Sequence, residues 1–482
     1  MEAVPIEPLE PERFADVLDG EQHQAFLRAL AQGRERLAGR TVHHVNSTAH
    51  GGGVAEMLQS LLGYLAGADI DARWLVIDGG DGFFEVTKRI HHLLHGEPGD
   101  GDDLDDAARR TLEEKLAPAA EDLRSRVRPG DVVVLHDPQP LPLAGAVRDA
   151  GATVLWTCHV GVDVPNDRSR AAWRFLLPDV ERTDAQIFSR PAYAWDVLDG
   201  STIEIIPPCI DAFSPKNQAL SDGAVDAILR TSGLIANGSR RTGDGDGDEP
   251  AFRRADGRPA RVRRRADLLQ EAPLTGEEPF VVQVSRWDPL KDPVGVLRAF
   301  AEFVPSSVET HLVLAGPAPD AVADDPESDG VLAEVRSAWE GLPAPARARV
   351  HVATLPMEDL EENAAIVNAL QRRAGVIVQK SLAEGFGLTV AEAMWKRRPT
   401  VGSRVGGIQD QIVDGESGLL VDDPRDLQAF AGAVTTVLED GELAARLGER
   451  AHERVRHEFL PPRYLTRWLD VVTRVLDGRR VP

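Results

Sequence analysis

The sequence predicts an α/β protein made of two doubly wound parallel-sheet (Rossmann-like) domains. Three observations support this fold class. Short apolar strands alternate with helical segments, each strand runs into a polar or glycine-rich turn, and the pattern breaks at about 208–225 and then starts again. Such alternation is typical of parallel sheets, whose strands are joined by helical crossovers. A length of 482 residues is enough for two or three domains with cores of their own.

The first domain is expected over residues 41–215, after a polar helical lead-in at 1–40. It begins with a strand, a glycine turn, a helix and a strand within 41–78. The helix is indicated by apolar residues at helical spacing, namely Val54, Met57, Leu58, Leu61, Leu62 and Leu65. Further strands are expected in 131–138, 152–160, 185–190 and 203–211.

The second domain is expected over residues 216–455, with strands in 279–293, 310–317, 349–356, 374–381 and 398–407. A helical segment at 456–482 follows, which the sequence allows to pack on either domain. Two segments have the composition of disordered chain, namely 96–110, an acidic loop that leads into a helix, and a low-complexity insertion at 237–265. Ligands of doubly wound folds bind at the carboxyl ends of the strands, so two facing domains are expected to form a cleft.

The net charge of the chain argues against two classes of binding partner. A net charge of −24 and a pI near 5.0 argue against nucleic acid or an anionic membrane as partner. No apolar run approaches the roughly 18 residues of a membrane helix, and the N-terminus lacks the apolar segment of a signal peptide. The two cysteines make neither a disulfide framework nor a zinc site. A cytoplasmic protein is therefore expected.

The stretch "KSLAEGFGLTVAEAMWKRRP" at 380–399 joins a strand, a glycine turn and a helix for which Thr389 is the expected cap. Glu384 lies in the turn and Glu392 in the first turns of the helix. Carboxylates accept hydrogen bonds from vicinal hydroxyls, as on a ribose or hexose. The helix dipole alone would explain Glu392, but the whole string, spaced by glycines, favours a ligand rich in hydroxyl groups.

The same helix start offers an anion site, because the amides of Gly387, Leu388 and Thr389 have no helical acceptors. Arg286 and Lys291 in "VSRWDPLKDP" follow another strand, where they would neutralise a diphosphate leaving group. A solvated basic pair is the alternative. Lys291 stands out because only six of the 54 basic residues are lysine.

The first domain contributes weaker signals. Gly51, Gly52 and Gly53 stand at the mouth of a helix, where a ligand can approach the backbone closely. His159 follows a strand end, and so do His136 and Asp137, although a lone histidine is more often structural. There is no G-x-S-x-G, H-E-x-x-H or C-x-x-C motif. A glycosidase pair is disfavoured, since Glu384 and Glu392 share one turn and helix.

These residues carry a family resemblance. "EGFGLTVAE" resembles the E-x7-E signature of retaining GT-B glycosyltransferases of the sucrose-synthase and glycogen-synthase-like superfamily, and Arg286 and Lys291 resemble its Arg/Lys pair. The resemblance covers about 40 to 460. "VNSTAHGGGVAEML", "FFEVTKRIHHLLHG", "WTCHVGVDV" and "PPCIDAFSPKN" are similar to trehalose synthases that join glucose from a nucleotide sugar to free glucose, and to the related trehalose phosphorylases.

The resemblance implies a GT-B fold and α-glucosyl transfer from a nucleoside diphosphate (NDP) glucose to glucose. The product is trehalose, formed with retention and without a cofactor or a required metal. In the implied front-face mechanism the departing phosphate oxygen takes the acceptor's proton, so no protein nucleophile is needed.

The resemblance also implies roles for the residues singled out above. Glu392 would hold the ribose hydroxyls and Glu384 the donor sugar hydroxyls. Arg286 and Lys291 would neutralise the diphosphate, and His159 would contact the donor hexose. The donor-binding turn and helix start would comprise Gly385, Phe386, Gly387, Leu388 and Thr389. Gly51 to Gly53 would approach the donor phosphate or the acceptor.

Several functions stay open at this point. A trehalose phosphorylase using glucose 1-phosphate has the same fold, as does another retaining glycosyltransferase with an NDP-sugar donor. A non-catalytic sugar-nucleotide sensor is the alternative outside enzymes. The expected partners are small sugars and sugar nucleotides, and a homodimer is left open.

Overall fold

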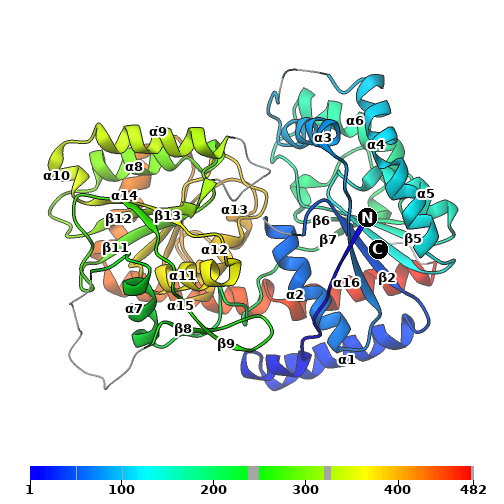
Figure 1. Ribbon diagram of the computed structural model, residues 1–482, viewed down its shortest axis with the longest axis horizontal. Coiled ribbons are helices and arrows are strands. Elements are labelled where there is room, and N and C mark those ends of the chain that lie inside the picture. The colour runs from blue at the N-terminus through cyan, green and yellow to red at the C-terminus, as the bar shows by residue number, and fades with distance from the viewer. Residues whose placement is uncertain (50–51, 100, 102, 237–248, 320–326, 479–482) are drawn as a thin grey trace. The chain divides into compact units, whose positions relative to one another are not determined.

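The computed structural model describes residues 1–49, 52–99, 101, 103–236, 249–319 and 327–478. These form two compact units, Met1–Cys209 with Phe459–Pro482, and Ile210–Glu458 (Figure 1). The chain therefore passes between units at 209/210 and at 458/459, where the sequence indicated changes at 215/216 and 455/456. In the described residues no helix is long and apolar enough to cross a membrane.

The first unit is built on a seven-stranded sheet in the order β1-β3-β2-β4-β5-β6-β7. Only the β1–β3 pairing is antiparallel among the ladders of this sheet. The strands are β1 (Glu2–Val4), β2 (Val42–Asn46), β3 (Ala72–Val76), β4 (Val132–His136), β5 (Thr153–Cys158), β6 (Ala185–Phe188) and β7 (Ile203–Ile205). The helices are α1 (Gly20–Arg36), α2 (Gly53–Gly67), α3 (Asp81–Leu94), α4 (Asp106–Arg126), α5 (Ala144–Asp149), α6 (Asp167–Val180) and α16 (Pro461–Leu476). Short 3-10 helices lie at Pro11–Asp16, Leu141–Leu143, Pro191–Tyr193 and Gly200–Thr202.

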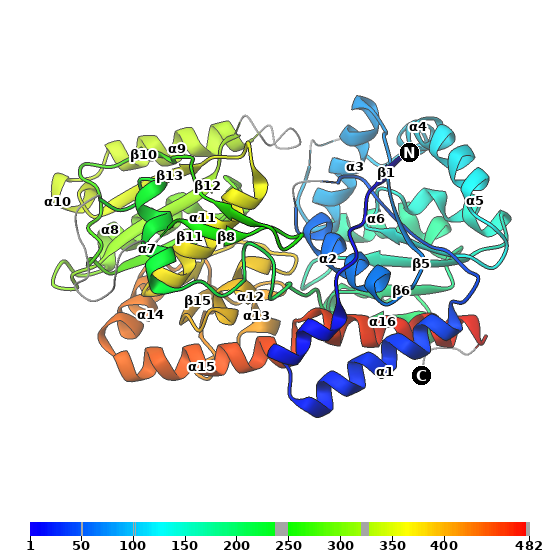
Figure 2. The ribbon, with the colours of Figure 1, turned by 60° about the horizontal axis from the view of Figure 1, so that its bottom comes forward.

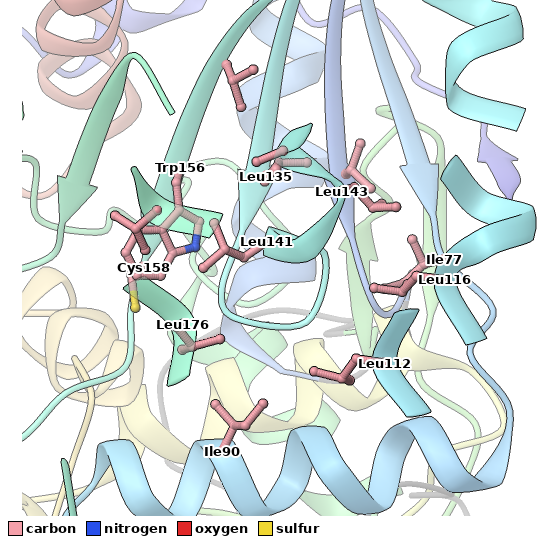
Figure 3. Close-up of a cluster of buried hydrophobic side chains, with 14 of the residues drawn as sticks. Ile77, Ile90, Leu112, Leu116, Leu135, Leu141, Leu143, Trp156, Cys158 and Leu176 are labelled. Carbon is pink, nitrogen blue, oxygen red and sulfur yellow. The ribbon is translucent and has the colours of Figure 1, made fainter. Parts of the chain in front are cut away.

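The core of this unit lies between the sheet and helices α3, α4 and α6. Figure 3 shows side chains of this cluster, with Leu135 and Trp156 from the strands and Ile90, Leu112 and Leu176 from the helices. All five are fully buried. The strands are covered on both faces, which explains why they are nearly continuous apolar runs in the sequence.

The C-terminal helix α16 belongs to this first unit, which answers the question that the sequence left open. It packs along α1, and both views show the two helices side by side (Figures 1 and 2). Gly33 makes this close approach possible, since a Cβ there would lie 2.6 Å from Cδ2 of Leu469. Trp468 of α16 also reaches the sheet, with its ring 5.6 Å from that of His44.

The second unit has a sheet of seven strands in the order β10-β13-β12-β11-β14-β15-β16. Here only β10 runs antiparallel to its neighbour. The strands are β10 (Asp267–Leu269), β11 (Phe280–Val284), β12 (His311–Pro317), β13 (Val350–Leu355), β14 (Val376–Gln379), β15 (Thr400–Ser403) and β16 (Leu419–Val421). The chain order reverses between β11 and β14, which is the switch point where doubly wound sheets bind ligands.

Helices cover both faces of this second sheet. The cluster that includes α8, α9 and α14 lies on one face, and α7 and α11 pack with a second cluster on the other. The helices are α7 (Asp222–Thr231), α8 (Pro293–Phe303), α9 (Ser328–Glu340), α10 (Ala344–Arg347), α11 (Leu360–Arg373), α12 (Leu388–Trp395), α13 (Ile408–Gln411), α14 (Leu427–Glu439) and α15 (Gly441–Glu458). A 3-10 turn, η5 (Pro289–Lys291), follows β11.

The expectation of disorder is wrong for the described part of the insertion, residues 249–265. It forms a hairpin of β8 (Ala251–Arg253) and β9 (Pro259–Arg261). Its few apolar side chains point inward, so that Phe252 and Val262 are buried with the core of the second unit. Arg254 also pairs with two carboxylates of the segment that begins α11. Composition was a poor guide because a few well-placed residues suffice to anchor a short hairpin.

The acidic segment 96–110 is described except for Asp100 and Asp102. The segment leads into a helix, as the sequence predicts, and this helix, α4, begins at Asp106. The carboxylate of Asp105 accepts hydrogen bonds from the amides of Ala107 and Ala108, both at 2.9 Å, and so caps the helix. This cap gives the acidic run a structural role at the helix start.

Candidate active site

A lysine and a glutamate from neighbouring strands of the second unit meet at the switch point. Lys291 lies in the turn after β11, and Glu384 lies in the turn after β14, the strand next to it. The Nζ of Lys291 donates to both carboxylate oxygens of Glu384, at 2.7 and 2.6 Å. Ser381 Oγ donates to the same carboxylate at 3.0 Å. The structure thus unites two predicted site residues that lie 93 positions apart.

The loop that carries Lys291 is held by its own hydrogen bonds. Gln283 Nε2 donates to the carbonyl of Lys291 at 2.9 Å, and Asp288 accepts from the amide of Leu290 at 2.8 Å. Asp292 adopts a left-handed conformation with φ of 46°, and its carboxylate caps α8 by accepting from Gly295 N–H at 3.0 Å. The lysine is therefore fixed at the start of a helix rather than on a long loop.

A second lysine, which is buried, stabilises this loop. It was not among the site residues predicted from the sequence. Lys380 is 1% exposed and forms an ion pair with Asp292, the residue after Lys291. It precedes Ser381 in the turn after β14. Its ammonium joins the two turns a second time, beside the Lys291–Glu384 pair. A buried lysine is stable only with such a partner.

The glycine turn before α12 departs from one prediction. The expectation that Thr389 caps the helix is wrong: the N-cap is Gly387, with φ of 83°, and no side chain caps the helix. Thr389 Oγ1 instead donates to Gln379 Oε1 at 3.1 Å, because Thr389 already lies inside the first turn. Gln411 holds the turn by donating to the carbonyl of Phe386 at 2.5 Å.

The amide groups at this helix start fit the predicted anion site. α12 begins at Leu388, so the N–H groups of Leu388 and Thr389 lie where an α-helix provides no acceptor. This end also carries the positive pole of the helix dipole. Gly385 stands in the same turn, with its carbonyl accepting from Gly407 N–H at 3.0 Å.

Glu392 lies one turn further into α12 and is almost fully buried, at 1% exposure. Its carboxylate lies 3.5 Å from Nζ of Lys216 and accepts from Gln371 Nε2 at 3.4 Å. Lys396 Nζ donates to the carbonyl of Glu392 at 3.2 Å. Sequence reasoning missed Lys216, Lys380 and Lys396, although the scarcity of lysine was a signal. Four of the six lysines, Lys216, Lys291, Lys380 and Lys396, lie around these two glutamates.

Arg286 follows β11 in the same loop as Lys291, but its contacts differ. Its guanidinium is 51% exposed and lies 3.2 Å from the carboxylate of Asp288. An exposed arginine can be redirected at little cost because surface ion pairs contribute about 0–1 kcal/mol. The structure places Arg286 in the same loop as Lys291, five residues before it.

In the first unit, Gly52 and Gly53 stand at the start of α2, while Gly51 lies outside the described residues. Gly52 is the N-cap with φ of 99°. A Cβ at Gly52 would meet nothing within 4 Å, so its conformation, and not crowding, calls for glycine. The open space around this backbone is consistent with a ligand-facing loop.

His159 lies just after β5 and is buried, with 8% exposure. Its amide donates to Asp137 Oδ1 at 2.8 Å, and Asp137 has φ of 63°. Among the described residues, neither ring nitrogen of His159 has a hydrogen-bond partner. Burial lowers the pKa of His159, and the nearby Asp137 carboxylate only partly opposes this. A neutral imidazole with unsatisfied nitrogens fits a residue that awaits a ligand or water.

His136 has a structural partner. It is the last residue of β4, and its Nε2 lies 3.0 Å from Nδ1 of His44 on β2. Burial lowers the pKa of His44 to about 3 and brings that of His136 well below its usual value. The two rings therefore share one hydrogen bond as neutral groups. The ring of His136 also stacks with that of His159. The two rings are nearly parallel, and their centroids lie 6.4 Å apart.

Two mostly parallel seven-stranded sheets, each covered by helices, make up the GT-B fold. The description "Trehalose synthase, N-terminal domain" matches residues 44–195, and "Glycosyl transferases group 1" matches 265–454. The chain belongs to the trehalose synthase family of group 1 glycosyltransferases.

Individual proteins support this assignment. The chain is 34% identical to the trehalose synthase of Pyrococcus horikoshii over 449 residues, which cover 91% of each chain. It is 34% identical to that of Rubrobacter xylanophilus over 89% of each. A trehalose phosphorylase of Pleurotus pulmonarius is 26% identical, but the match spans 57% of that longer protein.

A solved structure supports the fold alone. It is an alpha,alpha-trehalose-phosphate synthase (UDP-forming) from Burkholderia xenovorans in complex with glucose-6-phosphate. The TM-score is 0.64 at 15% identity, with 91% of this chain and all of that chain covered. The sequence-based expectations of a GT-B fold and of a trehalose synthase type glycosyltransferase are confirmed.

Proposed function

We propose that this glycosyltransferase moves an α-glucosyl group from an NDP-glucose to glucose and releases trehalose and NDP. The observation that carries the proposal is the Lys291–Glu384 ion pair at the switch point, together with the buried Glu392 in the helix that follows the turn of Glu384. Family membership supports the type of product. The position of the pair supports a donor with both a diphosphate and sugar hydroxyls.

Each residue of the second unit is assigned one part of the donor. Glu384 accepts hydrogen bonds from the donor sugar hydroxyls, and Glu392 accepts from the ribose hydroxyls. Lys291 uses two of its three ammonium hydrogens on Glu384, which leaves one for a diphosphate oxygen. Arg286 is assigned to the same diphosphate. In the first unit, His159 is assigned to a hydroxyl of the transferred hexose.

The proposed chemistry needs no protein nucleophile. The bond between the anomeric carbon and the diphosphate oxygen breaks, and the acceptor oxygen bonds to that carbon on the same face. The acceptor's proton passes to the departing diphosphate oxygen. Lys291, Arg286 and the amides of Leu388 and Thr389 stabilise the charge that builds on the diphosphate. Positioning of the two sugars supplies the remaining acceleration.

Product analysis tests the proposal. The purified chain is incubated with glucose and, separately, UDP-, ADP- or GDP-glucose, and trehalose and NDP are quantified. We expect the two products in equal amounts from at least one donor. Glucose 1-phosphate with glucose is run in parallel to test for a phosphorylase. Trehalose from glucose 1-phosphate alone would overturn the proposal.

The assembly and the cellular location stay predictions of the sequence. A homodimer is tested by the mass of the purified chain in solution. A cytoplasmic location is tested by fractionation of the source cells.

A further inference from the structure

The second unit contains a cavity of about 250 Å³ away from the candidate active site. It is lined by Leu220, Asp222, Val225, Asp226, Arg372, Arg373 and Arg398, and we call it the arginine pocket. Its walls come from α7, from the end of α11 and from the residues before β15. Figures 1 and 2 show α7 beside α11.

The arginine pocket lies at the opposite end of the sheet from Lys291. Arg372 and Arg373 precede β14, and Arg398 precedes β15, so these arginines stand at the amino ends of the two strands. Glu384 follows the carboxyl end of β14. The strand between them keeps the two places apart, so the pocket is not a part of the proposed donor site.

Within the residues that the structure describes, the three arginines of the pocket donate hydrogen bonds to neutral groups alone. Arg372 donates to Asn368 Oδ1 at 2.9 Å and to the carbonyl of Gln218 at 2.8 Å. Arg373 and Arg398 donate to backbone carbonyls. The Nε of Arg398 is buried without a hydrogen-bond partner among the described residues. Within that same part of the chain, none of the three forms an ion pair.

Electrostatics agrees with this geometry. Burial, together with the nearby Arg398 and Arg397, lowers the pKa of Arg372 to about 10. Burial and Arg373 also lower the pKa of Arg398, which Asp222 partly opposes. The chain carries 78 acidic and 54 basic residues, so carboxylate partners are plentiful. The pocket lining holds three arginines against two carboxylates, Asp222 and Asp226, so its net positive charge favours an anion from outside the chain.

The acidic residues of the pocket restrict what that anion can be. Asp222 and Asp226 lie on α7, whereas the arginines lie at the end of α11 and before β15, and Asp226 accepts from Arg230 at 3.3 Å. Carboxylates repel a bare anion but accept hydrogen bonds from hydroxyl groups. A ligand that carries a phosphate at one end and hydroxyls at the other satisfies both walls.

We propose that the arginine pocket binds a small phosphorylated polyol of hexose monophosphate size, with the phosphate on Arg372, Arg373 and Arg398 and hydroxyls on Asp222 and Asp226. Pockets for drug-sized ligands begin at roughly 300 Å³, so the volume suits one sugar phosphate better than a nucleotide sugar.

Calorimetric titration of the full chain with glucose 6-phosphate tests the proposal. We expect binding in the wild type and in Lys291→Ala, and binding weakened about tenfold or more in Arg398→Gln. The matched control is Arg349→Gln, since Arg349 is also partly buried and donates to backbone carbonyls. It should bind as the wild type does.

Three results would overturn the arginine pocket as the binding site. One is no binding by the wild type at up to about 10 mM ligand. The second is equal binding by Arg398→Gln, and the third is loss of binding in Lys291→Ala alone. If Arg398→Gln fails to fold, as judged by its thermal transition, Arg373→Gln takes its place under the same criteria.

A separate experiment tests whether the hydroxyl groups of the ligand contact the acidic residues of the pocket. Inorganic phosphate is titrated beside glucose 6-phosphate, and the ratio of the two affinities is compared between the wild type and Asp222→Asn. We expect glucose 6-phosphate to bind more tightly than phosphate in the wild type and to lose much of that advantage in Asp222→Asn. An unchanged ratio would overturn the assignment of hydroxyls to this wall.

Discussion

The ammonium of Lys291 bonds both carboxylate oxygens of Glu384, at 2.7 and 2.6 Å, and so ties the turns after two neighbouring strands together. The pair is mostly shielded from water, with side-chain exposures of 17% and 9%. A carboxylate and an ammonium held in one place present an acceptor for hydroxyls beside a cation for phosphate.

Lys291→Ala is expected to lower kcat about 100- to 1,000-fold, because it removes a cation from the diphosphate as the bond breaks. Steady-state kinetics with the preferred donor measures this. Lys115→Ala is the matched control, since that lysine is exposed on α4 of the other unit. A Lys291→Ala enzyme with full turnover and an unchanged thermal transition would contradict the assigned role.

Lys216→Met is expected to lower the free energy of unfolding by about 1–3 kcal/mol, because Glu392 stays buried without its cation. Urea denaturation measures the change. Lys115→Met should stay within about 0.5 kcal/mol of the wild type. Equal stability of Lys216→Met and the control would show that the 3.5 Å ion pair contributes nothing.

Gly33→Ala is expected to destabilise the first unit by about 1–3 kcal/mol, because the new methyl group would overlap Leu469 where α1 and α16 pack. Gly20→Ala, in the first turn of the same helix, meets no atom within 4 Å and serves as the control. It should be neutral or stabilising by up to about 1 kcal/mol. The free energy of unfolding of both variants is measured by denaturation under one condition. A Gly33→Ala protein as stable as Gly20→Ala would refute the packing argument.

Stability should fall in acid partly through His44. Its pKa is about 3 in the folded chain and about 6.5 in the unfolded chain. Below pH 6.5 the unfolded state therefore binds a proton that the folded state does not, and stability drops by about 1.4 kcal/mol per pH unit. The stabilisation is fully present above pH 6.5 and is lost as the pH falls toward 3.

The measurement is urea denaturation from pH 7 to pH 4.5, comparing the wild type with His44→Gln. In His44→Gln the free energy of unfolding should depend less steeply on pH, because the contribution of His44 is lost. His457→Gln, at an exposed position, should show the same pH dependence as the wild type. Parallel slopes for the wild type and His44→Gln would contradict the prediction.

The sequence by itself determined the local features of this protein. Alternating apolar strands and turns predicted the doubly wound architecture, because side-chain periodicity follows from backbone geometry. The spacing of Glu384 and Glu392 around a glycine turn pointed to a family, because a turn and the helix after it are contiguous in the chain. Lys291 was singled out by the scarcity of lysine.

Only the tertiary structure decided which distant residues meet. It paired Glu392 with Lys216, joined Asp292 to Lys380, and laid α16 on the first unit. It also buried Phe252 of the hairpin in the core of the second unit. Thr389, expected as the helix cap, instead donates a hydrogen bond to Gln379. Such contacts depend on strand order and on how helices pack over the sheet. The local periodicity of the sequence predicts neither of these.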